Sequence, residues 1–268
     1  TVPFRNDFIK AIKWFQQGLD WKPPHVIYHP SAQELREFLW QPNVPYWAYD
    51  VETDGVESLT AGLRCIGIGT SKAVAIVGLQ GIDGRTKFYK TQKEENDVIR
   101  VLQEFFTDSS KLKMGWNSGY FDRLIIENHL GITPSPHVDA MLFHRLAESE
   151  LPHSLGFAGS MYSEAPSWKT DREGRKKAYG SETDFELHEY CAYDVAITAE
   201  VLPPLQKRVQ DREQVECLQC DHKLQMVCAD MHKVGMHVDQ PTRLKFEQKF
   251  MHEIQERRET IRVLSEKD

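Results

Sequence analysis

The apolar positions of the chain repeat with two different spacings, and these predict helices and strands in a definite order. Steps of three and four residues predict amphipathic helices, whereas alternating or continuous apolar runs predict strands. The helical spacing is found over residues 2–19, 31–40, 92–106, 121–130, 139–148, 185–202, 205–234 and 241–264. The strand spacing is found over residues 46–51, 63–70, 73–79 and 112–116. A chain with both kinds of element is expected to fold as an α/β protein.

The order of the predicted strands indicates how the sheet is built. The first three follow one another closely, with Ser71-Lys72 as a hairpin turn. The fourth comes after a helix, which is typical of a crossover connection. We therefore expect a mixed central sheet flanked by helices. The expected domains are an N-terminal helical segment over 1–44, the α/β core over 45–204 and a helical appendage over 205–268.

Several helix ends are marked by residues that favour caps or breaks. Ser31 and Glu34 have the form of a capping box, in which each side chain bonds to the backbone amide of the other residue. Ser154 is expected to cap a further short helix. Pro203-Pro204 is expected to end the helix that begins near Phe185.

Four acidic residues lie on three predicted elements in positions that suit metal binding. Asp50 and Glu52 end the first strand two residues apart, so their side chains point to the same side and can share one cation. Asp122 lies in the first turn of a helix, and Asp194 lies in a later helix. By itself an Asp-x-Glu pair is more often a solvated strand end. Together the four carboxylates predict a site for two divalent cations, about 3.5–4 Å apart, that promotes phosphoryl displacement.

Tyr190 adds a hydroxyl group to this set. It stands four residues before Asp194, so both side chains project from one face of a helix. The phenol can then orient an attacking water while the aspartate holds a metal. A buried tyrosine and aspartate that only satisfy helix packing are the alternative.

These residues form three motifs, Asp50-x-Glu52, Asn117-x-x-x-Phe121-Asp122 and Tyr190-x-x-x-Asp194. Over residues 46–204 the sequence resembles the proofreading 3′→5′ exonucleases of the DEDD superfamily, in the tyrosine branch found in family A DNA polymerases. The sister branch has a histidine five residues before the final aspartate, where this chain has Glu189. The resemblance implies an RNase H-like fold, a water positioned by Tyr190, and two Mg²⁺ or Mn²⁺ ions held by Asp50, Glu52, Asp122 and Asp194.

The resemblance also implies residues that contact the substrate. Thr53 and Val56 fall where the family contacts the terminal nucleotide. Asn117 and Phe121 match positions that line the substrate cleft, although Asn117 can equally cap the following helix and Phe121 can equally be a core residue. Asp139 resembles another recurring family segment, but an N-cap role explains it as well, so it stays outside the metal set.

The distribution of charge limits how the chain can bind nucleic acid. The formal net charge is −7, which argues against holding duplex DNA by a global basic field. We expect the segment 162–184 to meet the phosphates and stack the bases of a single strand, although a solvated charge run is the alternative. The basic and aromatic residues of this segment that we take as candidates are Trp168, Arg172, Arg175, Lys176 and Lys177.

Cysteine usage and hydropathy bear on the cellular setting. The five cysteines are odd in number and lack the spacing of a disulfide framework, which indicates a reducing, intracellular compartment. No apolar run approaches the roughly 18 residues of a membrane span. The sequence therefore predicts a soluble protein without a membrane partner.

The C-terminal part bears on the substrate. Residues 224–264 resemble the region where a family A polymerase leaves its exonuclease domain. This implies either a covalently attached polymerase domain in the native protein or a free exonuclease that retains the junction. The expected function is proofreading during DNA replication, by release of nucleoside 5′-monophosphates from 3′ ends of single-stranded or frayed DNA. Two alternatives stay open: a catalytically silent DNA-binding or scaffold domain, and an exonuclease of the same superfamily that trims RNA. Retention of the four acids and the tyrosine favours catalysis.

Overall fold

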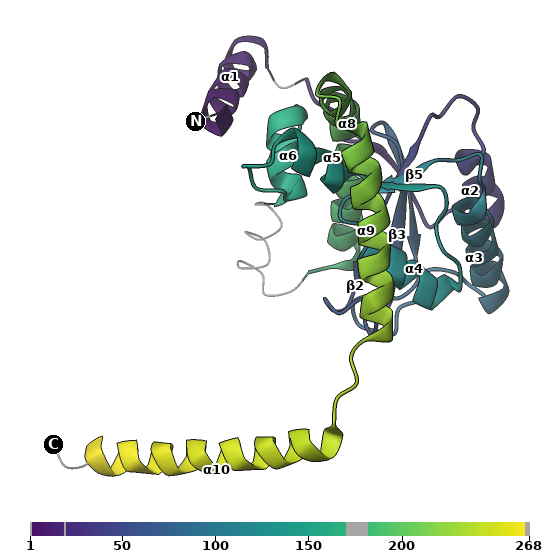
Figure 1. Cartoon of the computed structure of the whole chain (residues 1–268). Coiled ribbons are helices and arrows are strands. Elements are labelled where there is room, and N and C mark those ends of the chain that lie inside the picture. The colour runs from purple at the N-terminus through teal and green to yellow at the C-terminus, as the bar shows by residue number, and fades with distance from the viewer. Residues whose placement is uncertain (1, 19, 170–181, 266–268) are drawn as a thin grey trace. The chain divides into compact units, whose positions relative to one another are not determined.

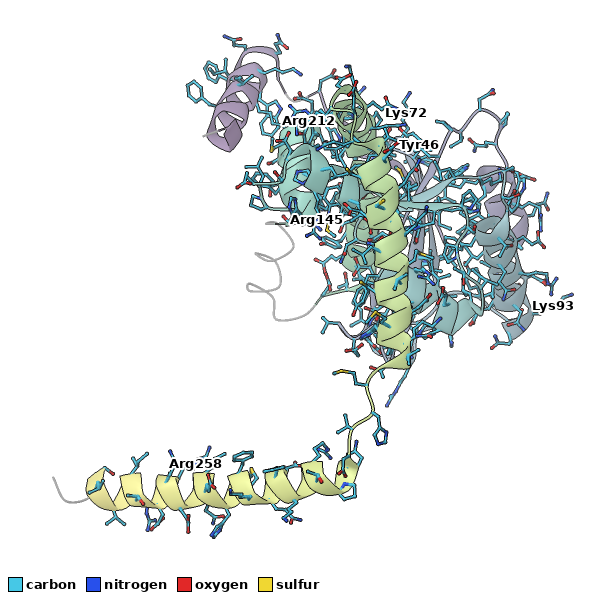
Figure 2. All side chains as sticks on the ribbon, in the orientation of Figure 1. Tyr46, Lys72, Lys93, Arg145, Arg212 and Arg258 are labelled. Carbon is cyan, nitrogen blue, oxygen red and sulfur yellow. The ribbon has the colours of Figure 1, made fainter. Side chains whose placement is uncertain are left out.

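The computed structural model describes residues 2–18, 20–169 and 182–265. The chain forms two compact units, Thr1–Ala229 and Asp230–Asp268. The first unit contains a mixed sheet with helices on both faces, so the predicted fold class is confirmed (Figure 1). Exposed basic residues such as Lys72 and Lys93 project from its surface (Figure 2). Within the described ranges, no helix combines the length and apolar character needed to cross a membrane.

The sheet has six strands in the order β1-β4-β3-β2-β5-β6. They are β1 (His25–Tyr28), β2 (Trp47–Thr53), β3 (Leu63–Gly69), β4 (Ala73–Gly78), β5 (Lys113–Gly115) and β6 (His137–Asp139). β2, β3 and β4 form the predicted antiparallel meander, and β5 adds in parallel to β2. β1 and β6, which the sequence pattern did not reveal, add in parallel at the two edges.

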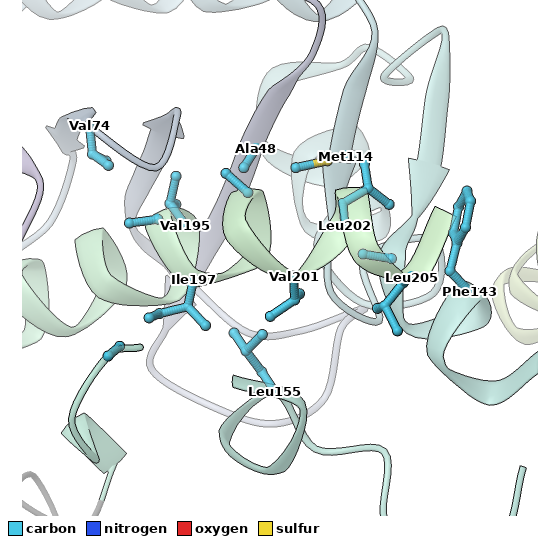
Figure 3. Close-up of a cluster of buried hydrophobic side chains, with 14 of the residues drawn as sticks. Ala48, Val74, Met114, Phe143, Leu155, Val195, Ile197, Val201, Leu202 and Leu205 are labelled. Carbon is cyan, nitrogen blue, oxygen red and sulfur yellow. The ribbon is translucent and has the colours of Figure 1, made fainter. Parts of the chain in front are cut away.

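Helices cover the sheet in two layers. Those of the described residues are α1 (Val2–Gln17), α2 (Ala32–Leu39), α3 (Gln92–Thr107), α4 (Asp122–Leu130), α5 (Ala140–Ala147), α6 (Leu155–Tyr162), α8 (Asp184–Asp211), α9 (Val215–Val234) and α10 (Gln240–Ser265). One buried apolar cluster joins α2, α3 and α4 to one face of the sheet, and a second joins α5, α6 and α8 to the other. In the second cluster Val195 and Leu202 of α8 pack with Ala48 of β2 and Met114 of β5 (Figure 3).

The helix α8 is longer than predicted. The expected break at Pro203-Pro204 is wrong, because α8 continues through both prolines to Asp211. A proline inside a helix costs roughly 3 kcal/mol. Val201, Leu202 and Leu205 are buried around the prolines, and their packing in the apolar cluster formed with the sheet, α5 and α6 offsets this cost. The helix predicted over 205–234 is consequently divided between the end of α8 and α9.

The predicted caps are confirmed. Ser31 and Glu34 form the capping box at the start of α2, and the Ser154 side chain accepts a hydrogen bond from Phe157 N at the start of α6. The predicted domain boundaries at residues 44/45 and 204/205 remain predictions.

A glycine allows α8 to approach the strand that bears the first motif. Gly67 of β3 pairs with Asp50 of β2. A Cβ atom at Gly67 would lie 2.7 Å from Cys191 Sγ and 3.0 Å from Val195 Cγ2 of α8, which is closer than packed atoms approach. The missing side chain therefore lets the helix of the third motif lie directly against β3 beside β2.

Candidate active site

The four predicted acids lie together in the structure. Asp50 and Glu52 are on β2, and burial raises the pKa of Asp50 well above its ordinary value. The second cause is the negative charge of three neighbouring carboxylates, those of Asp122, Asp194 and Glu52. Hydrogen bonds bring the three elements together, because Asp122 of α4 bonds to Val51 N of β2 and Cys191 of α8 bonds to Asp50 O of β2.

Asp122 is held against β2 by a backbone hydrogen bond. It is the first residue of α4 and is 5% exposed. Its Oδ1 accepts a hydrogen bond from Val51 N at 3.0 Å, which fixes the carboxylate beside the strand position between Asp50 and Glu52. Burial raises the pKa of Asp122 to about 7, against the lowering effect of this hydrogen bond. The hydrogen bonds that the protein supplies therefore do not fully offset the cost of burying the charged Asp122 carboxylate.

Asp194 and Tyr190 lie on α8 and share a lysine partner. Lys169 Nζ donates hydrogen bonds to Tyr190 Oη at 2.5 Å and to Asp194 Oδ2 at 2.7 Å. Trp168 Nε1 donates to Asp194 Oδ1 at 2.5 Å, so both carboxylate oxygens accept from a side chain. Burial by itself lowers the pKa of Lys169, but the adjacent Asp194 and Tyr190 raise it above its ordinary value, and the ammonium group stays protonated.

Tyr190 is a neutral hydrogen-bonding group at physiological pH. Burial raises its pKa to about 12, with a further contribution from the negative charge of Asp194. A phenol with this pKa keeps its proton near pH 7. Tyr190 can therefore orient a water molecule by hydrogen bonding, but it cannot serve as a base that removes the water's proton.

The donor set suits divalent cations, although the side chains are not yet arranged as metal ligands. Across the described parts of the chain, no three His, Cys, Asp or Glu side chains are close enough together to hold an ion. Carboxylate oxygens are nevertheless the ligands that Mg²⁺ and Mn²⁺ prefer. Burial, with a further contribution from neighbouring carboxylates, raises the pKa of Asp50 and Asp122, and bound cations would favour the charged form of both. The chemistry of these four carboxylates therefore fits divalent cations.

The predicted substrate contacts are placed less distinctly. Thr53 follows Glu52 on β2, and its Oγ1 donates to Gly55 O at 2.6 Å. Val56 is 96% exposed, so it is available to a ligand. Asn117 has a φ of 59° and does not cap α4, because the N-cap residue is Phe121. Phe121 packs in part against the apolar core, in agreement with the alternative interpretation of that residue.

In the segment 162–184, Trp168 is the one substrate-contact candidate among the described residues, and its surroundings differ from expectation. Trp168 was expected to stack on a nucleotide base, but its side chain is buried and bonded to Asp194. The ring packs in the apolar cluster that contains α5, α6 and α8. Burying this large apolar surface is more favourable than leaving it exposed to meet a nucleotide base. The other four candidates, Arg172, Arg175, Lys176 and Lys177, lie outside the described residues.

Asp139 supports the second motif from behind. It is the N-cap of α5, as the N-cap interpretation requires, and its side chain accepts from Met141 N. The same carboxylate accepts from the backbone amides of Asn117 at 2.9 Å and Gly119 at 3.1 Å. Gln225 Nε2 of α9 donates to it at 2.5 Å. Asp139 therefore holds the loop that leads into Asp122.

Two contributions were missed from the sequence. Lys169 was counted only as part of a basic segment, and the contact of α9 with Asp139 was not foreseen. The only signal for Lys169 was its position between the second and third motifs, which does not distinguish it from neighbouring basic residues.

Comparison with known families decides the classification. A family model described as 3′–5′ exonuclease matches residues 28–210, which is more than half of the chain. The chain belongs to the 3′–5′ exonuclease family. The match includes all three motifs. No curated protein matches the chain.

Solved structures of nucleases share the fold of this exonuclease. Brucella melitensis NrnC with bound Mg²⁺ is 18% identical with a TM-score of 0.57, over 80% of this chain and 94% of that one. Escherichia coli RNase D, described as an exoribonuclease involved in structured RNA processing, is 15% identical with a TM-score of 0.55, over 76% and 50%. The catalytic core of RRP6 from Trypanosoma brucei is 14% identical with a TM-score of 0.56, over 82% and 60%.

Proposed function

We propose that this chain hydrolyses the 3′-terminal phosphodiester bond of a single-stranded nucleic acid and releases nucleoside 5′-monophosphates, with two divalent cations as cofactors. The observation that carries the proposal is the geometry of β2, α4 and α8: Asp122 bonds to the β2 backbone between Asp50 and Glu52, and Asp194 shares the Lys169 ammonium group with Tyr190. This combination suits phosphoryl transfer to water, because the reaction needs concentrated positive charge and an oriented nucleophile.

Each residue has a definite task in this proposal. Asp50, Glu52, Asp122 and Asp194 hold the cations. When bound, the cations supply the positive charge that stabilises the phosphoryl transition state. Tyr190 keeps its proton and donates a hydrogen bond to the attacking water, which directs a lone pair of that water toward phosphorus. Val51 N and the Asp139 network keep Asp122 in place during the reaction.

For the substrate we propose short single-stranded RNA. Among proteins of similar fold, RNase D is described as an exoribonuclease and one structure of NrnC is bound to pGG, which supports an oligoribonucleotide before DNA. A DNA 3′ end is the second candidate, because residues 224–264 resemble the exit of a family A polymerase from its exonuclease domain. Proofreading and an attached polymerase belong to this second candidate.

The test compares RNA and DNA oligonucleotides of one sequence, each labelled at the 5′ end so that stepwise loss from the 3′ end forms a ladder. With Mg²⁺ or Mn²⁺ the parent protein should shorten RNA faster, and chelation with EDTA should stop the reaction. The double variant Asp50→Ala with Glu52→Ala should bind the oligonucleotide without shortening it. Faster digestion of DNA would transfer the proposal to the second candidate. A double variant as active as the parent would refute the active site.

A further inference from the structure

We propose that Lys169 is a positioning residue of this site, which fixes the direction of the Tyr190 hydroxyl group and shares Asp194 with a divalent cation. The inference rests on the proposed nuclease function, and it concerns a residue outside the three motifs. It follows from the contacts of one ammonium group with two residues of α8.

The hydrogen bond to Tyr190 restricts the direction of the phenolic proton. A lysine ammonium group can only donate, so the Tyr190 oxygen is the acceptor in the 2.5 Å contact. The phenol cannot then point its own proton at Lys169. That proton is left to a group on the other side of the oxygen, where it can orient a water molecule or a substrate oxygen. Lys169 thus restricts the directions in which the Tyr190 hydroxyl group can donate.

Lys169 is built into the site and is not a mobile surface lysine. Its side chain is 31% exposed, and its Nζ lies 4.6 Å from the ring centroid of Tyr190 and 5.4 Å from that of Trp168. Its aliphatic stem runs along α6 at Gly156, where a Cβ atom would lie 3.1 Å from Lys169 Cδ. The stem of Lys169 is therefore held by Gly156, its ammonium group by Tyr190 and Asp194, and the neighbouring Trp168 indole by Asp194.

The second contact makes Lys169 a neighbour of any cation that Asp194 binds. Asp194 Oδ2 accepts from Lys169 at 2.7 Å, and a carboxylate oxygen has a second lone pair that can face a metal. The ammonium group repels the cation that it adjoins and weakens its binding. Replacing Lys169 should therefore have two opposite effects: tighter binding of the cation and slower turnover, because Tyr190 is no longer directed.

The experiment uses Lys169→Met, which retains most of the apolar stem, together with Lys169→Arg, which retains the charge. Lys93→Met on α3 is the matched control, since it removes one exposed positive charge from the helix layer on the sheet face opposite α8 (Figure 2). Calorimetric titration with Mn²⁺ alone measures cation affinity without nucleic acid. Single-turnover cleavage of a 5′-labelled oligonucleotide at saturating Mn²⁺ measures the chemical rate.

For Lys169→Met we expect Mn²⁺ binding on the order of tenfold tighter and cleavage about tenfold to a hundredfold slower. Lys169→Arg should keep the parental Mn²⁺ affinity and lose rate, because the charge remains but the geometry changes. Lys93→Met should match the parent in both. If Lys169→Met does not fold, as judged by its melting curve, the arginine variant alone decides.

The possible failures can be told apart. A parent protein that neither binds Mn²⁺ nor cleaves the oligonucleotide would refute the proposed function. A parent protein that does both, with a methionine variant unchanged in rate and affinity, would refute only the role of Lys169. The role of Lys169 would also be refuted if the methionine variant lost both cleavage rate and Mn²⁺ affinity. An arginine variant with the parental cleavage rate would refute it as well.

Discussion

At the scale of single residues, Tyr190 offers a way to separate water orientation from metal binding. Tyr190→Phe keeps the ring and all four carboxylates and removes only a hydroxyl group, which a pKa of about 12 keeps protonated. We expect the hydrolysis rate to fall by about one to three orders of magnitude, as for the loss of one positioned donor. Mn²⁺ affinity, measured by calorimetry, should stay at the parental value. A parental cleavage rate would exclude a role for the hydroxyl group.

His137 leads to a prediction about pH and stability. Its Nε2 lies 2.8 Å from Ser118 Oγ. Burial is the main cause that lowers its pKa from 6.5 to about 3, and the neighbouring His222, Arg123 and Lys113 contribute in the same direction. Between these pKa values the unfolded chain carries a proton at His137 that the folded chain does not. The free energy of unfolding therefore decreases as pH falls through this range.

The substitution His137→Gln removes this titration. Between pH 6 and pH 4 the slope of the unfolding free energy against pH should be smaller in the variant than in the parent, by up to about 1.4 kcal/mol per pH unit. Urea unfolding of the parent and the variant at several pH values measures both slopes under one set of conditions, so that other titrating groups cancel. Equal slopes would mean that His137 is protonated in the folded protein.

At the scale of elements, the approach of α8 to β3 decides whether the motifs meet. Gly67→Ala places a methyl group 2.7 Å from Cys191 Sγ and 3.0 Å from Val195 Cγ2. Relief of this overlap requires the side chains of Cys191 and Val195, or α8 itself, to shift, so we expect a loss of about 1–3 kcal/mol in unfolding free energy and a reduced cleavage rate.

Gly55→Ala is the matched control for this variant. A Cβ atom at Gly55 would meet only Ala61 Cβ, at an ordinary contact distance of 3.6 Å. Urea midpoints and cleavage rates of the two variants provide the comparison. A Gly67→Ala protein as stable and active as the Gly55→Ala protein would show that the close approach is not needed.

At the scale of the whole molecule, folding brings four like charges together at one site, which costs stability. Cations that bind the folded protein and not the unfolded chain should recover this loss, by about 2.7 kcal/mol at a concentration one hundred times the dissociation constant. The melting temperature should therefore rise with Mn²⁺ and fall again with EDTA.

In EDTA the Asp50→Ala, Glu52→Ala variant should melt above the parent, because burial and repulsion no longer act on Asp50. A lower melting temperature for the variant in EDTA would contradict this account.

The sequence by itself determined the main elements and the chemistry of the candidate site. The two-residue period of a strand placed Asp50 and Glu52 on one side of β2, and the four-residue spacing of a helix placed Tyr190 beside Asp194. The caps at Ser31 and Ser154 were readable in the same way. These features depend on backbone geometry over a few residues, which is why the sequence alone could predict them.

Only the tertiary structure decided which partners those residues have. It buried Trp168 and set Lys169 against Asp194 across 25 positions of sequence, although the same segment was expected to be an open basic surface. It also carried α8 through Pro203-Pro204, because packing of its buried side chains outweighs the lost backbone hydrogen bonds. Such contacts depend on which distant side chains fill a common space, and no local period of the sequence encodes that.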